Sequence, residues 1–169
     1  MKKLTGVTLV TAFLFSVQAQ AASPQLLGEY GDWSAYVYKD GRGSICYMVS
    51  RPKKDEGKYS KRGDIYAVVT HRPADKTFDV VNFDAGYTFK TNEPFVVKIG
   101  HNTVTGFFTE GEKAWTLDEA TDKKMVALMK NGDRMIVDGV SSTGTKTKDT
   151  YSLKGFTGAY KAISAKCKR

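Results

Sequence analysis

Two cysteines, Cys46 and Cys167, are the residues of this chain with the most obvious chemical potential. A cysteine standing alone in a sequence can be a nucleophile, a metal ligand or one half of a disulfide. A nucleophile needs a base such as histidine, and a metal ligand needs companions at a spacing such as C-x-x-C. Neither cysteine has such companions, and His71 and His101 stand in unrelated contexts. The sequence therefore favours a disulfide between the two cysteines, with the other two interpretations kept as alternatives.

The N-terminus predicts the compartment of these cysteines. Lys2 and Lys3 precede an apolar run over residues 4–17, and Ala19 and Ala21 are the small residues that a signal peptidase reads. The run is short of the roughly 20 residues that span a bilayer, so residues 1–21 are predicted to be a secretory signal peptide rather than an anchor or a buried helix. We expect an exported protein, located in the periplasm or at the cell surface in association with the outer membrane, where disulfides persist. No later apolar run is long enough to cross a membrane.

The remaining polar residues form no recognisable catalytic or metal-binding motif. The sequence contains no H-E-x-x-H, no G-x-S-x-G and no phosphate-binding glycine motif. We therefore predict no catalytic residues, no metal and no cofactor. Carboxylates could still meet in the fold and do acid–base chemistry, so a hydrolase-like periplasmic enzyme is the alternative hypothesis. Its candidate carboxylates are Asp64, Asp79, Asp84 and Asp149.

A basic segment, residues 51–63, is the stronger candidate for binding. Six cations fall within twelve residues, diluted by Asp55 and Glu56; they are Arg51, Lys53, Lys54, Lys58, Lys61 and Arg62. Such a run can bind an anionic partner with an affinity that falls as salt rises, or it can be a solvated loop that keeps the protein soluble. The expected partners are a protein, a glycan or an anionic envelope component. Nucleic acid is not expected, because the protein is predicted to be exported and lacks an RNA-recognition motif.

Aromatic side chains offer a second candidate surface. Trp33, Tyr36, Tyr38 and Tyr47 lie on neighbouring predicted strands, and alternation along a strand turns some of them outward. An outward tyrosine-rich face could bind a glycan or a protein. Cross-strand aromatic pairing explains the same pattern without any ligand.

Short strands separated by turns must position these residues. Alternating or continuous apolar patterns predict strands at residues 33–38, 44–50, 64–71, 77–83, 95–99, 102–108 and 134–141, with strand character again within 143–153. This pattern is typical of an antiparallel sandwich or barrel. We predict a mainly β fold, with one antiparallel β-sandwich-like domain over residues 22–169.

Two segments have helical rather than strand periodicity. Residues 118–130 begin with acidic side chains, carry Met125, Leu128 and Met129 on one face and end at Asn131-Gly132. A second helix is predicted at residues 156–166. Phe156, Tyr160, Ile163 and Cys167 follow one another at spacings of four, three and four, which places Cys167 on the inward face. A bridge to Cys46 would fasten this helix to the sheet.

Several motifs, taken in order, resemble the invasion-associated locus B family of α-proteobacteria. They are a G-x-W-x-x-Y opening, a cysteine-bearing strand, an Arg-Pro after a strand, a single Trp before a helix and a T-x-T-x-D-x-Y-S-L-x-G-F ending. They fall on Gly31, Trp33, Tyr36, Cys46, Arg72-Pro73, Trp115, Thr145, Asp149, Tyr151 and Phe156. The resemblance runs from Gly31 to about Ile163 and implies an exported β-rich protein without known enzymatic activity. Some family members are linked to host-cell invasion, and no catalytic or ligand-binding residues are implied.

Overall fold

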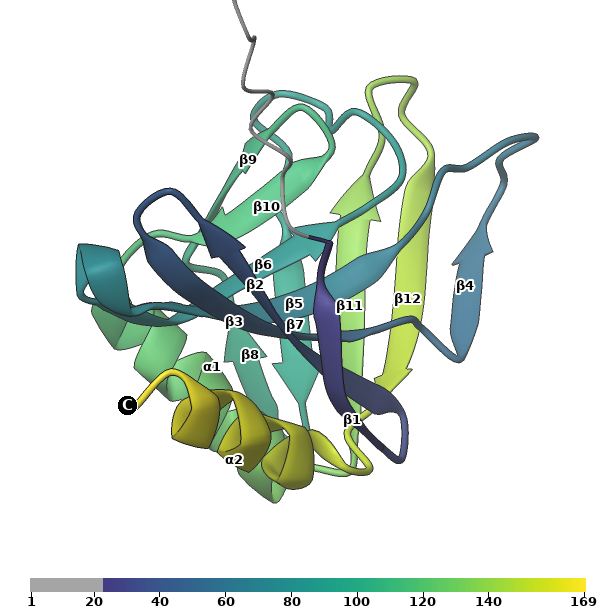
Figure 1. Cartoon of the computed structure of the whole chain (residues 1–169). Coiled ribbons are helices and arrows are strands. Elements are labelled where there is room, and N and C mark those ends of the chain that lie inside the picture. Colours follow the sequence, from purple (N-terminus) through teal and green to yellow (C-terminus); the bar gives the residue numbers. More distant parts are fainter. Residues whose placement is uncertain (1–22) are drawn as a thin grey trace, which may run out of the picture.

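Two antiparallel β-sheets and two helices form the part of the chain that this computed structural model describes, residues 23–169 (Figure 1). The predicted mainly β, antiparallel architecture with two helices is confirmed. The predicted signal peptide, residues 1–21, lies outside the described residues.

The larger sheet has seven strands. Their order across the sheet is β1 (Gln25–Tyr30), β2 (Trp33–Asp40), β3 (Gly43–Ser50), β5 (Tyr66–Arg72), β6 (Thr77–Asp84), β10 (Lys113–Thr116) and β9 (Phe107–Glu110). A 3₁₀ turn, Pro73–Asp75, connects β5 to β6. The alternation in β2 is regular, with Trp33, Ala35 and Val37 buried and the residues between them partly exposed. This period of two gives the sheet one core-facing side and one outer side.

The smaller sheet has five strands. Their order is β4 (Lys54–Gly57), β12 (Lys146–Ser152), β11 (Arg134–Val140), β7 (Val96–Ile99) and β8 (Asn102–Val104). Aromatic packing joins the two sheets, because the Phe83 ring of the larger sheet lies 6.4 Å from the ring of Tyr151 on β12. Phe95, just before β7, is 5.3 Å from Phe83 on its other side.

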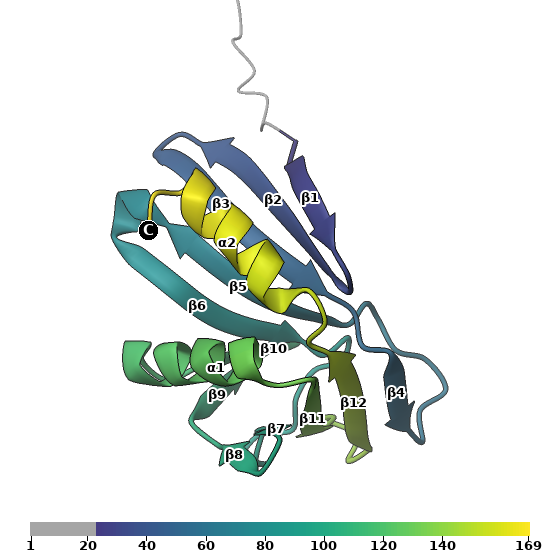
Figure 2. The same ribbon diagram turned by 90° about the horizontal axis from the view of Figure 1, so that it is seen from below.

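Both helices cover the core-facing side of the larger sheet (Figure 2). Helix α2 (Phe156–Lys166) packs over β1, β2 and β3, and α1 (Glu119–Asn131) packs over β6 and β10. The buried residues of α2 include Phe156, Tyr160 and Ile163, as the helical spacing predicts. The outer side of the larger sheet therefore has no helix over it.

The helix ends follow from local chemistry. Asp118 caps α1 by accepting a hydrogen bond from the Thr121 amide at 2.7 Å. Gly155 starts α2 with a φ of 91°, and a Cβ at this position would lie 1.7 Å from the carbonyl oxygen of Tyr30. Only glycine fits here, because both the backbone angle and the close approach exclude a side chain.

One predicted strand is wrong in an informative way. Residues 102–108 form two short strands in different sheets, since β8 pairs with β7 and β9 pairs with β10. The break lies at Thr105-Gly106, where the Gly106 carbonyl accepts a hydrogen bond from the Leu117 amide. Apolar periodicity continues across the break and does not reveal that the chain changes sheets.

Three strands were not expected from the sequence: β1, β4 and β10. Strand β4 lies inside the basic segment and pairs with β12 at the edge of the smaller sheet. All four of its residues are exposed. Without a buried side it has no apolar alternation for a sequence pattern to detect.

Candidate partner-binding site

A groove crosses the uncovered outer side of the seven-stranded sheet. Its volume is about 770 Å³, and its floor is formed by Tyr36, Tyr47, Val49, Tyr66 and Val68. We call this feature the tyrosine groove. Its charged rim consists of Glu29, Asp32 and Arg51.

Strand register explains why these side chains share one face. Tyr36 is directly opposite Tyr47 across β2 and β3, and Val49 is opposite Val68 across β3 and β5. The Tyr36 and Tyr47 rings stack with their centroids 5.2 Å apart, and Tyr38 meets Tyr47 edge-on at 6.1 Å. Of the aromatic residues proposed from the sequence, these three tyrosines lie on the outer side, whereas Trp33 is buried beneath α2.

The tyrosine hydroxyls on this outer side, in the groove and at the neighbouring Tyr38, are available for hydrogen bonding. Within residues 23–169, those of Tyr36, Tyr38 and Tyr47 have no hydrogen-bond partner, while that of Tyr66 accepts from Arg51. Burial, followed by the two neighbouring tyrosines, raises the pKa of Tyr47, so its hydroxyl keeps its proton at neutral pH. The groove thus presents apolar surface together with hydroxyl donors.

One residue of the basic segment, Arg51, lines this groove, and a second, Lys53, pairs with the rim residue Asp32. Arg51 lies over the Tyr66 ring at 4.5 Å and donates to Asp64 at 3.1 Å. Lys53 donates to Asp32 at 2.6 Å, and that hydrogen bond lowers the pKa of Asp32. Both cations are paired within the chain, but their side chains are still 60% exposed.

The other lysines of the segment lie further from the groove. Lys54 pairs with Glu56 at 2.9 Å on the exposed strand β4. Lys58 and Lys61 are exposed and make no ion pair with any residue of the described chain. They are the cations of this segment that could reach an external anion without giving up an internal partner.

Arg62 requires a correction, because it is buried and not available to a partner. Its guanidinium donates two hydrogen bonds to Asp149, both at 2.6 Å, and a third to the Ala85 carbonyl at 2.7 Å. It lies between the rings of Tyr59 and Tyr87, and its side chain is 3% exposed. Burial lowers the pKa of Arg62, but the hydrogen bonds that it donates to Asp149, with the negative charge of that carboxylate, outweigh burial and raise the pKa of Arg62. Arg62 therefore connects the segment to the smaller sheet.

The four candidate carboxylates have four different cationic partners. Asp64 pairs with Arg51, Asp79 with Arg169, Asp84 with Lys113 and Asp149 with Arg62. Asp79 and Asp84 are both on β6, but Asp79 is buried with the helices above it and Asp84 is on the outer side. The structure does not bring these acids together as a general acid and base.

His71 is buried and contacts both a serine and an aspartate. Its Nδ1 accepts from the Asp79 backbone amide at 3.1 Å, so Nε2 carries the hydrogen and donates to Ser164 Oγ at 3.1 Å. A serine nucleophile needs the reverse arrangement, in which Nε2 accepts the hydroxyl proton. Burial lowers the pKa of His71 and keeps the ring neutral. The contact fastens α2 to β5 and does not activate the serine.

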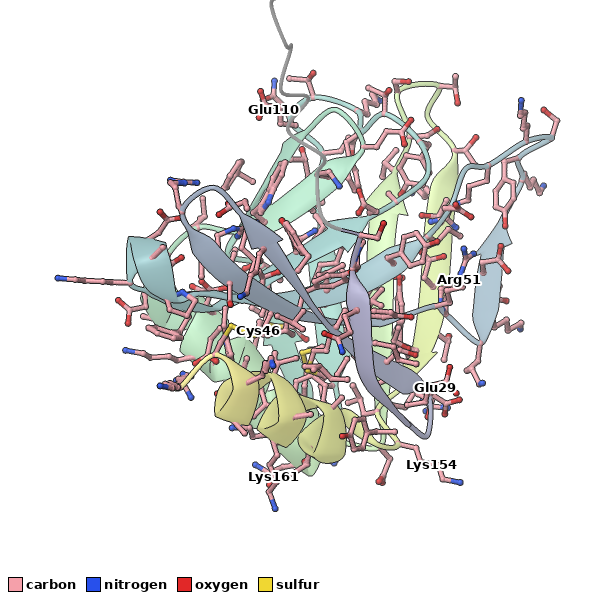
Figure 3. All side chains as sticks on the ribbon, viewed as in Figure 1. Glu29, Cys46, Arg51, Glu110, Lys154 and Lys161 are labelled. Carbon is pink, nitrogen blue, oxygen red and sulfur yellow. A yellow bond between two sulfur atoms is a disulfide. The ribbon has the colours of Figure 1, made fainter. Side chains whose placement is uncertain are left out.

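The two cysteines meet as the sequence predicts. Cys46 on β3 and Cys167 after α2 have sulfur atoms 2.11 Å apart and Cα atoms 6.0 Å apart, which is disulfide geometry (Figure 3). Residues 23–169 contain no free cysteine. Neither a nucleophilic nor a metal-binding cysteine is present in this arrangement.

Two further searches cover the described residues. Between residues 23 and 169, neither helix has the length and apolar character needed to cross a membrane. The same range holds no group of three or more His, Cys, Asp or Glu side chains placed to bind a metal ion.

A family model and a solved structure are similar to this chain. The family model described as Invasion associated locus B (IalB) protein matches residues 33–164. Among solved structures, the chain is similar to invasion associated protein B from Bartonella henselae, with a TM-score of 0.57 and 18% sequence identity. That alignment covers 83% of this chain and 96% of the other, and at this identity it shows a shared fold. A search of curated proteins found no match.

Proposed function

This chain belongs to the invasion associated locus B family, and we propose that it is an exported, non-catalytic binding protein whose contact surface is the tyrosine groove. Its partner is a protein of the cell envelope or of a host cell. The observation that carries the proposal is an apolar sheet face with no helix over it, on which three tyrosine hydroxyls have no partner within residues 23–169.

The composition of the groove supports a protein partner. Protein interfaces are enriched in tyrosine and arginine and depleted of lysine and glutamate at their centres. The groove floor consists of tyrosine and valine, with Arg51 beside Tyr66. Tyrosine gives a large contact area for little loss of conformational freedom. The stacking of Tyr36 on Tyr47 restricts these two rings before any partner binds.

The rim of the groove supports the same class of partner. Glu29 and Asp32 provide negative charge, and Arg51 provides positive charge. Mixed signs around an apolar centre match the polar rim of a protein interface. A uniformly anionic ligand would meet repulsion from Glu29 and Asp32.

The proposal also includes export from the cytoplasm and a link to invasion, and each of these has its own support. The predicted signal peptide and the Cys46–Cys167 pair both favour an oxidising compartment outside the cytoplasm. The family and the Bartonella protein are described as invasion associated. We extend that description to this chain as a contact with an envelope or host protein.

Position-specific crosslinking in intact cells tests the proposal. A photoreactive amino acid replaces Val49 on the groove floor or, as a control, Lys148 on the outer side of the smaller sheet. We expect a defined adduct from position 49 and none from position 148. The adduct should be lost when Tyr36→Ser and Arg51→Ala are added. Equal adducts from both positions would refute the groove as the contact surface. So would the absence of an adduct from position 49 both in free-living bacteria and in bacteria in contact with host cells.

A further inference from the structure

The helices carry a second basic surface, which no run of charges in the sequence reveals. Residues 154–169 contain five basic and no acidic side chains. Five exposed lysines on and around the two helices make up this surface, which we call the helix face: Lys124, Lys130, Lys154, Lys161 and Lys168.

Three of these lysines lie on or beside α2. Lys161 is an exposed residue of the helix itself, apart from its buried stripe of Phe156, Tyr160 and Ile163. Lys154 precedes the N-cap Gly155 and Lys168 follows the C-cap Cys167, so these two lysines flank the ends of the helix. Lys161 projects away from the sheets on the helix side of the molecule, and Lys154 lies beside the turn between β1 and β2 (Figure 3).

Contacts between the helices bring the lysines of α1 next to those of α2. The Lys130 ammonium lies 3.6 Å from the centre of the Tyr160 ring. The Thr157 hydroxyl donates to the Lys130 carbonyl at 3.5 Å. The C-terminal end of α1 is therefore in contact with the N-terminal half of α2, and Figure 2 shows both helices on the same side of the larger sheet.

The lysines of the helix face have no ion pairs within residues 23–169, and most of the nearby acids have other partners. Asp133, whose carbonyl accepts from the Leu153 amide, is the exposed acid beside this surface that forms no ion pair within the described residues. Glu119 pairs with Lys123 at 2.6 Å, and Asp79 pairs with Arg169. Asp122 is buried and accepts from the Val81 amide, and Asp118 caps α1. The helix face thus keeps a net positive charge.

We infer that the helix face binds the surface of a membrane that contains anionic phospholipids. Lysine ammonium groups are point charges without the fork geometry that selects one small anion. Here they are spread over two helices, which suits an extended plane of lipid phosphates. None of the exposed large apolar side chains, Leu26, Phe108 and Leu117, belongs to either helix, so binding is electrostatic and without insertion.

This orientation leaves the floor of the tyrosine groove free. The helices cover the core-facing side of the seven-stranded sheet, and the groove floor is on its opposite side. The two surfaces approach each other only at the groove rim, where the Lys154 carbonyl accepts a hydrogen bond from the Asp32 amide at 3.0 Å. A protein attached by its helix face would direct the groove away from the membrane. The inference is independent of the proposed function, because either surface could act without the other.

Vesicle co-sedimentation of the processed protein tests this inference. The vesicles are phosphatidylcholine with or without phosphatidylglycerol, at about 50 mM and about 300 mM salt. The test variant is Lys154→Glu/Lys161→Glu/Lys168→Glu. The control is Lys54→Glu/Lys58→Glu/Lys61→Glu, which makes the same change of charge in the basic segment. Circular dichroism and thermal unfolding confirm that both variants fold.

We expect binding only to vesicles with phosphatidylglycerol, and a steep loss at high salt. The loss of three lysines at about fivefold in affinity each, together with the repulsion from three added glutamates, should weaken binding by the helix-face variant at least about 100-fold. The control variant should stay within about threefold of the unmodified protein. Absence of binding at low salt, equal losses in both variants, or a larger loss in the control would each overturn the inference. Crosslinking from position 161 to an acidic protein, without vesicle binding, would also overturn it.

Discussion

The basic segment and the helix face are both rich in lysine, yet they differ in what the fold does with the charge. In the basic segment the cations are neighbours in sequence, and acids from outside the segment neutralise three of the six: Asp32 pairs with Lys53, Asp64 with Arg51 and Asp149 with Arg62. In the helix face the lysines are scattered through the sequence and have no such partners within the described residues. A run of charge along a chain therefore does not measure the electrostatic field that the folded surface presents.

The two regions also differ in how they are attached to the core. A buried ion pair, Arg62–Asp149, joins the basic segment to the smaller sheet. Helix α2 is held by the Cys46–Cys167 pair, by His71 through Ser164 and by its apolar stripe. Removing the Arg62–Asp149 pair should therefore loosen mainly the basic segment, whereas removing the cysteine pair should loosen mainly α2.

The largest effect is expected from the disulfide. The double variant Cys46→Ala/Cys167→Ala opens a loop closed over a sequence separation of 121. On the chain-entropy account this costs about 4–5 kcal/mol of unfolding free energy, to be measured by urea denaturation. Unmodified protein isolated without reductant should have an intact mass two protons below the reduced value. Free thiols in that sample would contradict the pairing. In the double variant α2 is held less firmly, so binding of the helix face to anionic vesicles should also weaken.

The next effect concerns two cations of the same segment. Arg62→Ala leaves Asp149 buried without a partner and should reduce the unfolding free energy by about 3–5 kcal/mol. Lys58→Ala removes an exposed charge and should change it by less than about 0.5 kcal/mol. The pair Arg62→Met/Asp149→Leu should recover most of the loss, because neither charge then remains buried. Similar losses for Arg62→Ala and Lys58→Ala would show that the segment is uniformly exposed.

Acid should lower the stability of the protein through His71, which contacts α2, by less than the two changes above. Burial lowers the pKa of His71 in the folded state, so the unfolded chain binds the proton more readily. The stabilisation is complete above the unfolded pKa of about 6.5 and is lost as pH falls below it toward the folded value. Thermal unfolding between pH 7.5 and pH 5 should show this fall, and it should be smaller in His71→Gln. An identical pH profile for the variant would assign the acid sensitivity to other groups.

Strands with one buried side were predictable, and strands without one were not. Residues 33–38 and 44–50 alternate because one side faces the core, and the structure has β2 and β3 there. Strand β4 escaped notice because all its residues are exposed. The single strand predicted at 102–108 was wrong, since the chain keeps its apolar pattern while it passes from one sheet to the other. Local periodicity reports burial and not the identity of the strand's neighbours.

The candidate sites divide in the same way. The count of two cysteines and the helical spacing around Cys167 were enough to predict their pairing, and the tyrosines of β2 and β3 were predictable as partly outward. The groove itself needed β5, which supplies Tyr66 and Val68. The helix face needed the packing of α1 against α2.

Sequence alone was sufficient for the properties that depend on residues close together in the chain. These are the β-rich class, the two helices and the motifs that indicate the family. The fate of the charges depended on contacts between distant residues, such as Arg62 and Asp149, which are 87 positions apart. An ion pair forms where folding brings two side chains together, so only the tertiary structure could show that Arg62 is buried and that Lys154, Lys161 and Lys168 remain unpaired among the described residues.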